Sequence, residues 1–136
     1  MGPLTPNPNP IALTCGEPAG LAPEITAKAW LALRDASAAS FFLIGDDDYF
    51  SRRATLAGIP IATAKISTPG EAREIFSTAL PILHRPLAVQ PKPGIIDPAT
   101  AKGVIAAIDE GVALTMAGDA AITPFAVAGS IMPGLG

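Results

Sequence analysis

Charged residues are scarce in this sequence. Only 15% of its 136 residues are charged, against about 25% in an ordinary soluble domain. The charges sum to −3 at pH 7, which excludes the basic face that binding to nucleic acid requires. Because 49% of the residues are hydrophobic, the composition predicts apolar surface that an interface or further sequence would cover.

Cysteine and histidine each occur once, as Cys15 and His84. A single cysteine excludes a disulfide within the chain and a cysteine zinc site. We interpret Cys15 as a small buried residue at a strand end, and a nucleophilic thiol near a helix N-terminus is the alternative. His84 has only Leu83 and Arg85 beside it, so we predict a surface or edge-strand histidine and no metal ligand or base.

Long apolar runs and targeting signals are also missing. No run approaches the length of about 18 residues that a membrane-spanning helix needs. The N-terminus has neither the basic nor the apolar segment of a signal peptide, so we expect a cytoplasmic protein. Residues 1–10 carry prolines at positions 3, 6, 8 and 10, which predicts a disordered or extended leader.

The first organised stretch is a strand, a loop and a helix. Residues 11–13 form a short apolar run typical of a buried strand, and residues 23–33 predict an amphipathic helix that begins at Pro23, with apolar Ile25, Ala29, Trp30 and Leu33. The intervening loop holds two glycines and a proline, a composition that can bring the unpaired N–H groups of a helix N-terminus to a ligand. A purely structural turn is the alternative, because the spacing fits neither the dinucleotide nor the P-loop pattern.

Strands and helices are predicted to alternate along the rest of the chain. After a connector over residues 35–40 we expect a strand at 41–44, a helix at 49–57, an extended segment at 59–66, a short helix at 72–79, a strand at 80–83, a loop at 86–93, a helix from 97–98 to 117 and a strand that starts at 119. This alternation predicts an α/β fold with a mostly parallel or mixed sheet and flanking helices. Pro81 cannot donate a ladder hydrogen bond, so strand 80–83 is expected at a sheet edge.

Local signals mark several helix ends. Of the three aspartates at 46–48, Asp46 or Asp47 is predicted to cap the helix that follows, because the calcium-loop pattern is absent. Gly58 and Gly118 are predicted to end helices in the left-handed conformation. One face of the last helix is expected to be buried, and it carries Ala101, Val104, Ile105, Ile108, Val112 and Met116.

The loop after the first strand carries a resemblance to a known family. Its residues are Thr14, Gly16, Glu17, Pro18, Ala19, Gly20, Leu21, Pro23 and Glu24. In this order they resemble the opening motif T-x-G-[DE]-P-A-G-I-G-P-E of 4-hydroxythreonine-4-phosphate dehydrogenases. Leu21 replaces the Ile of that motif and Ala22 replaces a Gly. The helix from Asp97, followed by a strand and Thr123-Pro124, is similar to the same family.

The resemblance implies a fold and a chemistry. The fold would be the N-terminal part of an isocitrate-dehydrogenase-like two-domain architecture. The family's members are homodimers that use NAD and a divalent metal held by three histidines to oxidise and decarboxylate a phosphorylated hydroxy amino acid, in pyridoxal phosphate biosynthesis. The resemblance places six residues of this loop in the cleft where substrate and cofactor meet: Thr14, Gly16, Glu17, Pro18, Ala19 and Gly20. Glu17 is the one carboxylate among the six, and we assign it no base role, because a helix-capping or loop-bracing role fits it at least as well. His84 matches none of the three histidines, so we assign no catalytic residue and no metal ligand.

The resemblance ends after Thr123. Residues 124–136 are uncharged and rich in small side chains, so we divide the chain into a leader (1–10), a partial α/β domain (11–123) and a divergent tail (124–136). A frameshift, an early stop or an incomplete gene reading near Thr123 is our hypothesis for the tail, and we expect this chain alone to be inactive. Two alternatives stay open: a sister dehydrogenase for another phosphorylated hydroxy acid, or a non-catalytic α/β module that binds a small anion or a partner.

Overall fold

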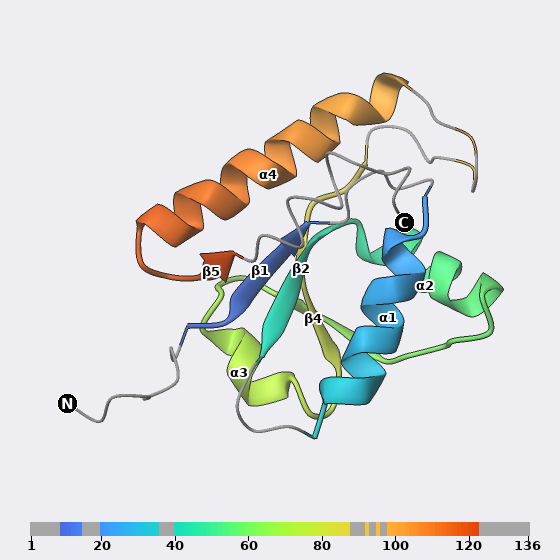
Figure 1. The fold of residues 1–136 in the computed structure, drawn as a ribbon, viewed down its shortest axis with the longest axis horizontal. Helices are drawn as coiled ribbons and strands as arrows, with labels where there is room; N and C mark the ends of the chain where they lie inside the picture. Colours follow the sequence, from blue (N-terminus) through green and yellow to red (C-terminus); the bar gives the residue numbers. More distant parts are fainter. Residues whose placement is uncertain are drawn as a thin grey trace.

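A five-stranded, all-parallel sheet forms the centre of the molecule (Figure 1). The computed structural model describes residues 9–14, 20–35, 40–87, 92, 95 and 98–122. In spatial order the strands are β3 (Thr63–Ile66), β4 (Leu80–His84), β2 (Phe41–Gly45), β1 (Ile11–Thr14) and β5 (Ala121–Ile122). The helices are α1 (Ala22–Leu33), α2 (Asp47–Leu56), α3 (Glu71–Ile75) and α4 (Ala101–Met116), the last preceded by a 3-10 turn, η1 (Pro98–Thr100). The predicted α/β class is confirmed.

The two faces of the sheet bury separate hydrophobic clusters. Phe41 and Leu43 of β2 pack in the cluster that α1 and α2 cover, whereas Phe42 and Ile44 pack in the cluster that includes α3 and α4. Successive side chains of a strand point to opposite faces, so a strand covered on both sides must be apolar at every position. The unbroken run in β2 is therefore the sequence signature of a central strand. Trp30 of α1 anchors the first cluster and donates its indole N–H to the Phe76 carbonyl at 2.8 Å.

The connections explain why the helices divide into two layers. The chain moves in one direction across the sheet from β1 to β2 to β3, and then returns through β4 to β5. Because such crossovers are right-handed, reversing the direction places the next helix on the opposite face. The neighbouring strands β2 and β4 thus send their following segments to opposite faces. Ligands bind open α/β sheets at such a switch point, at the carboxyl ends of the strands.

The expectation that strand 80–83 lies at a sheet edge is wrong. β4 runs between β3 and β2. Its pairing with β2 extends only from Ile82 to His84, so the missing N–H of Pro81 lies outside that ladder. Leu80, one residue earlier, donates its N–H to the Ala62 carbonyl on the β3 side. A proline can therefore occupy a central strand when the ladder on its side begins one residue later.

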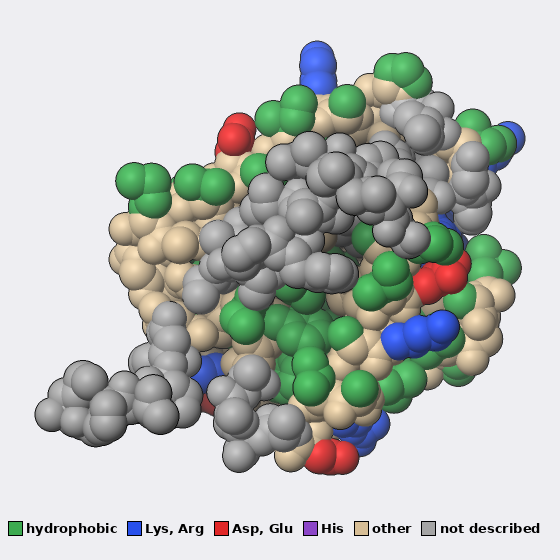
Figure 2. Space-filling model, in the orientation of Figure 1, with side chains coloured by type: hydrophobic (Ala, Val, Ile, Leu, Met, Phe, Trp, Pro, Cys, Tyr) green, Lys and Arg blue, Asp and Glu red, His purple; other side chains and the backbone are tan. Residues whose placement is uncertain are grey.

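The predicted buried face of the last helix is largely wrong. Ala107 and Leu114 of α4 pack against the sheet, and Gly111 is buried there. In contrast, Ile105 is 58% exposed and Met116 is 84% exposed, and hydrophobic side chains along α4 reach the surface in Figure 2. Apolar residues surround much of this helix, so the periodicity alone did not select one face.

α1 shows a smaller error of the same kind. Ile25 and Leu33, which were predicted to lie on its apolar face, are 41% and 43% exposed. Its buried residues are Pro23, Thr26, Ala27 and Trp30. Thr26 can be buried because its hydroxyl donates to the Ala22 carbonyl at 2.8 Å, which satisfies the polar group within the helix.

The predicted cap at Asp46 and the two predicted glycine turns are confirmed, whereas the helix predicted from Asp97-Pro98 becomes α-helical only at Ala101, after η1. Asp46 is the N-cap of α2, with its side chain accepting the Tyr49 N–H. Gly58 and Gly118 follow α2 and α4 with φ of 75° and 82°, the left-handed conformation that glycine adopts at low cost. Two elements are shorter than predicted, since α3 ends at Ile75 and β3 begins at Thr63.

Several predicted features lie outside the described residues: residues 1–8 of the leader, residues 15–19 of the motif loop, Asp97, and the tail from Thr123 onward. Of the leader, the structure describes Pro10, which is buried, and Asn9, which donates its amide N–H to the Gly118 carbonyl at 2.6 Å. Within the described part of the chain, no helix has the length and hydropathy needed to cross a bilayer.

Candidate functional site

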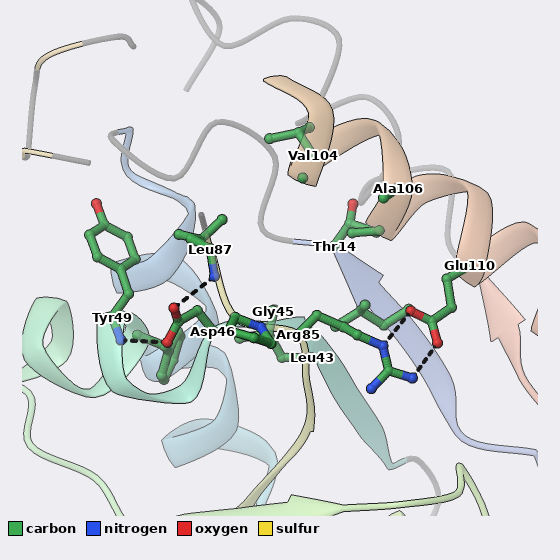
Figure 3. Close-up of a pocket in the computed structure, with 15 residues that line it drawn as sticks. Thr14, Leu43, Gly45, Asp46, Tyr49, Arg85, Leu87, Val104, Ala106 and Glu110 are labelled. Carbon is green, nitrogen blue, oxygen red and sulfur yellow. Dashed lines mark hydrogen bonds and ion pairs between the residues drawn. The ribbon is translucent and has the colours of Figure 1, made fainter. Parts of the chain in front are cut away.

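A cavity of about 270 Å³ opens at the carboxyl ends of β1, β2 and β4, beneath α4 (Figure 3). This is the switch point of the sheet. Its polar lining comes from Thr14 at the end of β1, Asp46 after β2, Arg85 after β4 and Glu110 on α4. The other lining residues are mostly apolar and include Leu43, Phe50, Leu87 and Val104.

Asp46 joins two of the segments around the cavity. One of its carboxylate oxygens accepts the Tyr49 N–H at 3.1 Å, and the other accepts the Leu87 N–H at 2.9 Å (Figure 3). The side chain is buried, with 7% of Asp46 exposed. The cap was predictable from the sequence, but the bond to Leu87 was not, because 41 residues separate the two. Asp46 thus fixes the segment after β4 to the start of α2.

Arg85 and Glu110 connect β4 to α4 across the cavity. The Arg85 Nε and Nη2 atoms donate to the two Glu110 carboxylate oxygens at 2.9 and 2.6 Å, a bidentate pair visible in Figure 3. The hydrogen bond and charge of Glu110 raise the pKa of Arg85, against the opposing effect of burial. Arg85 also donates to the His84 carbonyl at 2.8 Å. Among the described lining residues Arg85 is the one cation and is paired with Glu110, while the Asp46 carboxylate adds a further negative charge. The described lining therefore offers no unpaired cation to an anionic ligand.

His84 is not an edge-strand residue, so that part of its prediction is wrong. It is half-buried at the end of the central strand β4, and its Nδ1 accepts the N–H of Asp47, the first residue of α2, at 3.1 Å. A remote imidazole thus satisfies one of the N–H groups that a helix leaves unpaired at its start. Within the described residues no group of three or more His, Cys, Asp or Glu side chains could hold a metal. The implied three-histidine metal site does not fit these residues.

Arg53 is a functional candidate that the sequence reasoning missed. It lies on α2 with 4% of its surface exposed. Its Nη2 donates to the Gly20 carbonyl at 2.6 Å and to the Glu24 carboxylate at 3.2 Å, and its Nη1 donates to the Tyr49 hydroxyl at 2.9 Å. Burial would lower the pKa of Arg53, but the bonds to Tyr49 and Glu24 outweigh it and raise that pKa. Its partners Gly20 and Glu24 are 33 and 29 residues away in the sequence. No local sequence pattern therefore indicates these contacts.

The structure describes two of the six predicted site residues, Thr14 and Gly20. Thr14 is 8% exposed and lines the cavity. Gly20 lies where the motif loop enters α1, and Arg53 holds its carbonyl. Gly16, Glu17, Pro18 and Ala19 are outside the described residues, as is Cys15. The described part of the motif therefore lies at two points on the carboxyl side of the sheet.

The size and lining of the cavity limit what it could bind. Small-molecule sites usually measure about 300–1,000 Å³ and combine apolar walls with a few polar groups. At about 270 Å³ this cavity lies just below that range, with the same kind of lining. Its size suits a small group or one part of a larger ligand.

Comparison with individual known proteins relates the chain to dehydrogenases of one name. No family model matches the chain. Its sequence is 38% identical over 119 residues to a 4-hydroxythreonine-4-phosphate dehydrogenase of Bradyrhizobium diazoefficiens, covering 82% of this chain and 34% of that protein. A Zymomonas mobilis protein of the same name is 38% identical over 111 residues, covering 82% of this chain and 32% of its own length. The chain thus spans about a third of the length of the curated relatives it matches.

Solved structures show the same fold. A crystal structure of 4-hydroxythreonine-4-phosphate dehydrogenase from Klebsiella pneumoniae matches 90% of this chain and 40% of its own with a TM-score of 0.68, at 24% identity. The corresponding structure from Burkholderia phymatum matches 88% of this chain and 38% of its own with a TM-score of 0.72, at 20% identity. The arrangement of strands and helices described above is therefore that of these proteins.

Proposed function

The chain belongs to the 4-hydroxythreonine-4-phosphate dehydrogenase family, and from this premise we propose that it forms one wall of the substrate and cofactor cleft of such a dehydrogenase. The complete enzyme would oxidise and decarboxylate 4-hydroxythreonine-4-phosphate for pyridoxal phosphate biosynthesis, as a homodimer. The observation that carries the proposal is the cavity at the switch point of the sheet. Thr14 of the family-like motif lies in its lining.

The chemistry of the reaction divides between this segment and the rest of an enzyme. NAD would accept the hydride of the substrate's secondary alcohol. The 136 residues contain one histidine, and its Nδ1 is engaged with α2, so the segment does not supply a three-histidine metal site. We propose that its contribution is to shape the cleft through Thr14 and the segments that Asp46 and Arg53 fix.

This division predicts that the 136-residue chain alone does not convert the substrate. We expect no NADH absorbance at 340 nm when the purified chain is mixed with NAD, 4-hydroxythreonine-4-phosphate and Mg²⁺, Mn²⁺ or Zn²⁺. The full-length Bradyrhizobium diazoefficiens relative serves as the positive control in the same buffer. Steady NADH formation by the chain alone would overturn this part of the proposal.

A chimera tests whether this segment can form a wall of the cleft in a complete enzyme. Residues 11–122 of this chain would replace the matching segment of the Bradyrhizobium diazoefficiens relative, with which it shares 38% identity. If the segment forms a cleft wall of this enzyme, a folded chimera regains activity with 4-hydroxythreonine-4-phosphate. Circular dichroism and gel filtration establish that the chimera is folded. A folded chimera without dehydrogenase activity would refute the proposed role.

The two rival functions lead to different outcomes of these experiments. A sister dehydrogenase would make a chimera that prefers another phosphorylated hydroxy acid. A non-catalytic module is favoured by one observation, the high apolar content of the chain, of which 49% of the residues are hydrophobic. It would bind a small anion as the isolated chain. Inorganic phosphate titrated into the isolated chain, followed by NMR shifts of cavity-lining amides, distinguishes this case.

A further inference from the structure

Arg53 lies at the centre of a polar network that links two helices on the same face of the sheet. Its guanidinium contacts Tyr49 on its own helix α2, Glu24 in the first turn of α1, and the Gly20 carbonyl just before α1. Since 33 and 29 residues separate Arg53 from Gly20 and Glu24, these bonds fix the relative position of segments that the chain itself does not hold together.

Among the described residues, no side chain of the α1 segment caps the start of α1. Leu21 occupies the N-cap position and makes no side-chain capping bond, whereas Asp46 caps α2 with its carboxylate. A helix start normally relies on a polar side chain at the N-cap for its position and stability. Arg53 instead donates hydrogen bonds to the Gly20 carbonyl before the helix and to the Glu24 carboxylate in its first turn. A residue on the neighbouring helix α2 thus fixes the α1 terminus.

A guanidinium is suited to this task in a way that an ammonium is not. Three separate acceptors surround it, at 2.6, 2.9 and 3.2 Å, and its planar fork of five donors serves several of them at once. A lysine ammonium would retain the charge near Glu24 but would have a single nitrogen for all contacts. The Arg53 side chain is also buried, where an unpaired polar group is costly.

We propose that Arg53 is a positioning residue: it sets the place of Gly20 and of the first turn of α1 at the carboxyl side of the sheet. Asp46, seven residues earlier and at the start of the same helix, does the same for the segment after β4. Through these two residues, α2 holds both Gly20 with the first turn of α1 and the segment after β4. The importance of this alignment for catalysis rests on the proposed function, whereas the alignment itself does not.

Amide hydrogen exchange of the 136-residue chain, followed by NMR, tests the proposal directly. The Ile25 N–H bonds to the Leu21 carbonyl in the first turn of α1, and the Arg34 N–H bonds to the Trp30 carbonyl at its other end. In Arg53→Ala we expect Ile25 to exchange at least about tenfold faster, the effect of losing a hydrogen bond to a charged group. Arg34 should exchange at the wild-type rate. Arg53→Lys should lie between Arg53→Ala and wild type for Ile25.

The dependence on urea separates positioning from general stability. If Arg53 acts locally, Ile25 exchange in Arg53→Ala is fast and almost independent of low urea concentrations, because it occurs by local opening. Arg52→Ala, at the exposed neighbouring position on the same helix, is the matched control and should leave Ile25 exchange unchanged. Ethylguanidinium added to Arg53→Ala should slow Ile25 exchange again, and ethylammonium should not.

Two outcomes would overturn the proposal. The first is equal acceleration of Ile25 and Arg34 with strong urea dependence, which means that Arg53 only stabilises the fold. The second is unchanged Ile25 exchange in both Arg53→Ala and Arg53→Lys. If Arg53→Ala does not fold, the Arg53→Lys comparison decides alone. None of these readouts needs enzymatic turnover, so an inactive chimera with localised Ile25 exchange refutes the proposed function and leaves the positioning role intact.

Discussion

Asp46 is a single carboxylate that serves two distant segments, and its removal tests that double role. We expect Asp46→Ala to lower the free energy of unfolding by about 3 kcal/mol, because it removes a helix cap worth about 1 kcal/mol and leaves the Leu87 N–H without its charged partner. Asp46→Asn should lose less, since its amide oxygen can still accept one of the two N–H groups. Urea unfolding followed by Trp30 fluorescence measures both variants.

The control for Asp46 is its exposed neighbour Asp48. Asp48→Ala removes the same charge from the first turn of α2, where acids interact favourably with the helix dipole. We expect a loss of about 0.5 kcal/mol, typical of an exposed charge. Equal losses for Asp46→Ala and Asp48→Ala would mean that charge alone, and no specific bond to Tyr49 or Leu87, explains the effect.

Glu71 makes the stability of the chain depend on pH through local bonds. The backbone N–H groups of Thr68 and Ser67 donate to its carboxylate at 2.7 and 2.6 Å, and with the Thr68 hydroxyl they lower the pKa of Glu71 below its ordinary value of 4.5. A lowered folded-state pKa means that this contribution is complete above the unfolded pKa and is lost as the pH falls through the folded value. The stabilising effect of Glu71 should therefore vanish only in acid below about pH 4.5.

The comparison between wild type and Glu71→Gln isolates this effect. We expect Glu71→Gln to be less stable than wild type at pH 7 and the two to converge towards pH 3, as read from urea midpoints across the range. Glu74→Gln, at an exposed position in the same helix, is the matched control and should run parallel to wild type. A gap between wild type and Glu71→Gln that does not change with pH would contradict the assignment.

At the scale of elements, α4 presents two apolar faces of which only one is buried. Leu114 packs against the sheet, whereas Ile105 points to solvent. We expect Leu114→Ala to lower the free energy of unfolding by about 2 kcal/mol, since it removes partly buried methyl groups. Ile105→Ala should stay within about 0.5 kcal/mol of wild type, because it removes exposed area and gains helix propensity. Urea unfolding ranks the two variants, and the opposite order would contradict the described packing.

At the scale of the whole molecule, the exposed apolar surface predicts self-association of the isolated chain. The outer stripe of α4, formed by Ile105, Val112 and Met116, is 42–84% exposed, and adjacent apolar residues on one helix face favour association. In sedimentation velocity we expect the sedimentation coefficient to rise with protein concentration. The double variant Ile105→Lys/Met116→Lys should stay monomeric over a wider range.

A control at another surface sharpens this prediction. Leu56 on α2 is 76% exposed but lies away from the outer stripe of α4. Leu56→Lys should leave the association unchanged, because it removes apolar area from a different element. A single monomeric species for the wild-type chain at all concentrations would refute the prediction. It would also favour the reading of the chain as a self-sufficient module.

Features that depend on neighbours along the chain could be predicted from the sequence. The alternation of strands and helices, the cap at Asp46 and the left-handed turns at Gly58 and Gly118 follow from local hydrogen bonding and backbone preferences, and the structure confirms them. The motif from Thr14 to Glu24 was specific enough to name the family, because its glycines and prolines stand in a rare order. These features could be predicted since each depends on residues only a few positions apart.

Features that depend on pairing between distant segments became visible only in the three-dimensional fold. It placed β4 inside the sheet despite Pro81, because the ladder with β2 begins one residue later. It chose which face of α4 is buried, because apolar residues occupy several faces and the sheet contacts just one. It also gave Arg53 and His84 their partners on other elements. The candidate site was predicted as a loop, but the cavity beside it arises where the sheet reverses its winding, which no short stretch of sequence encodes.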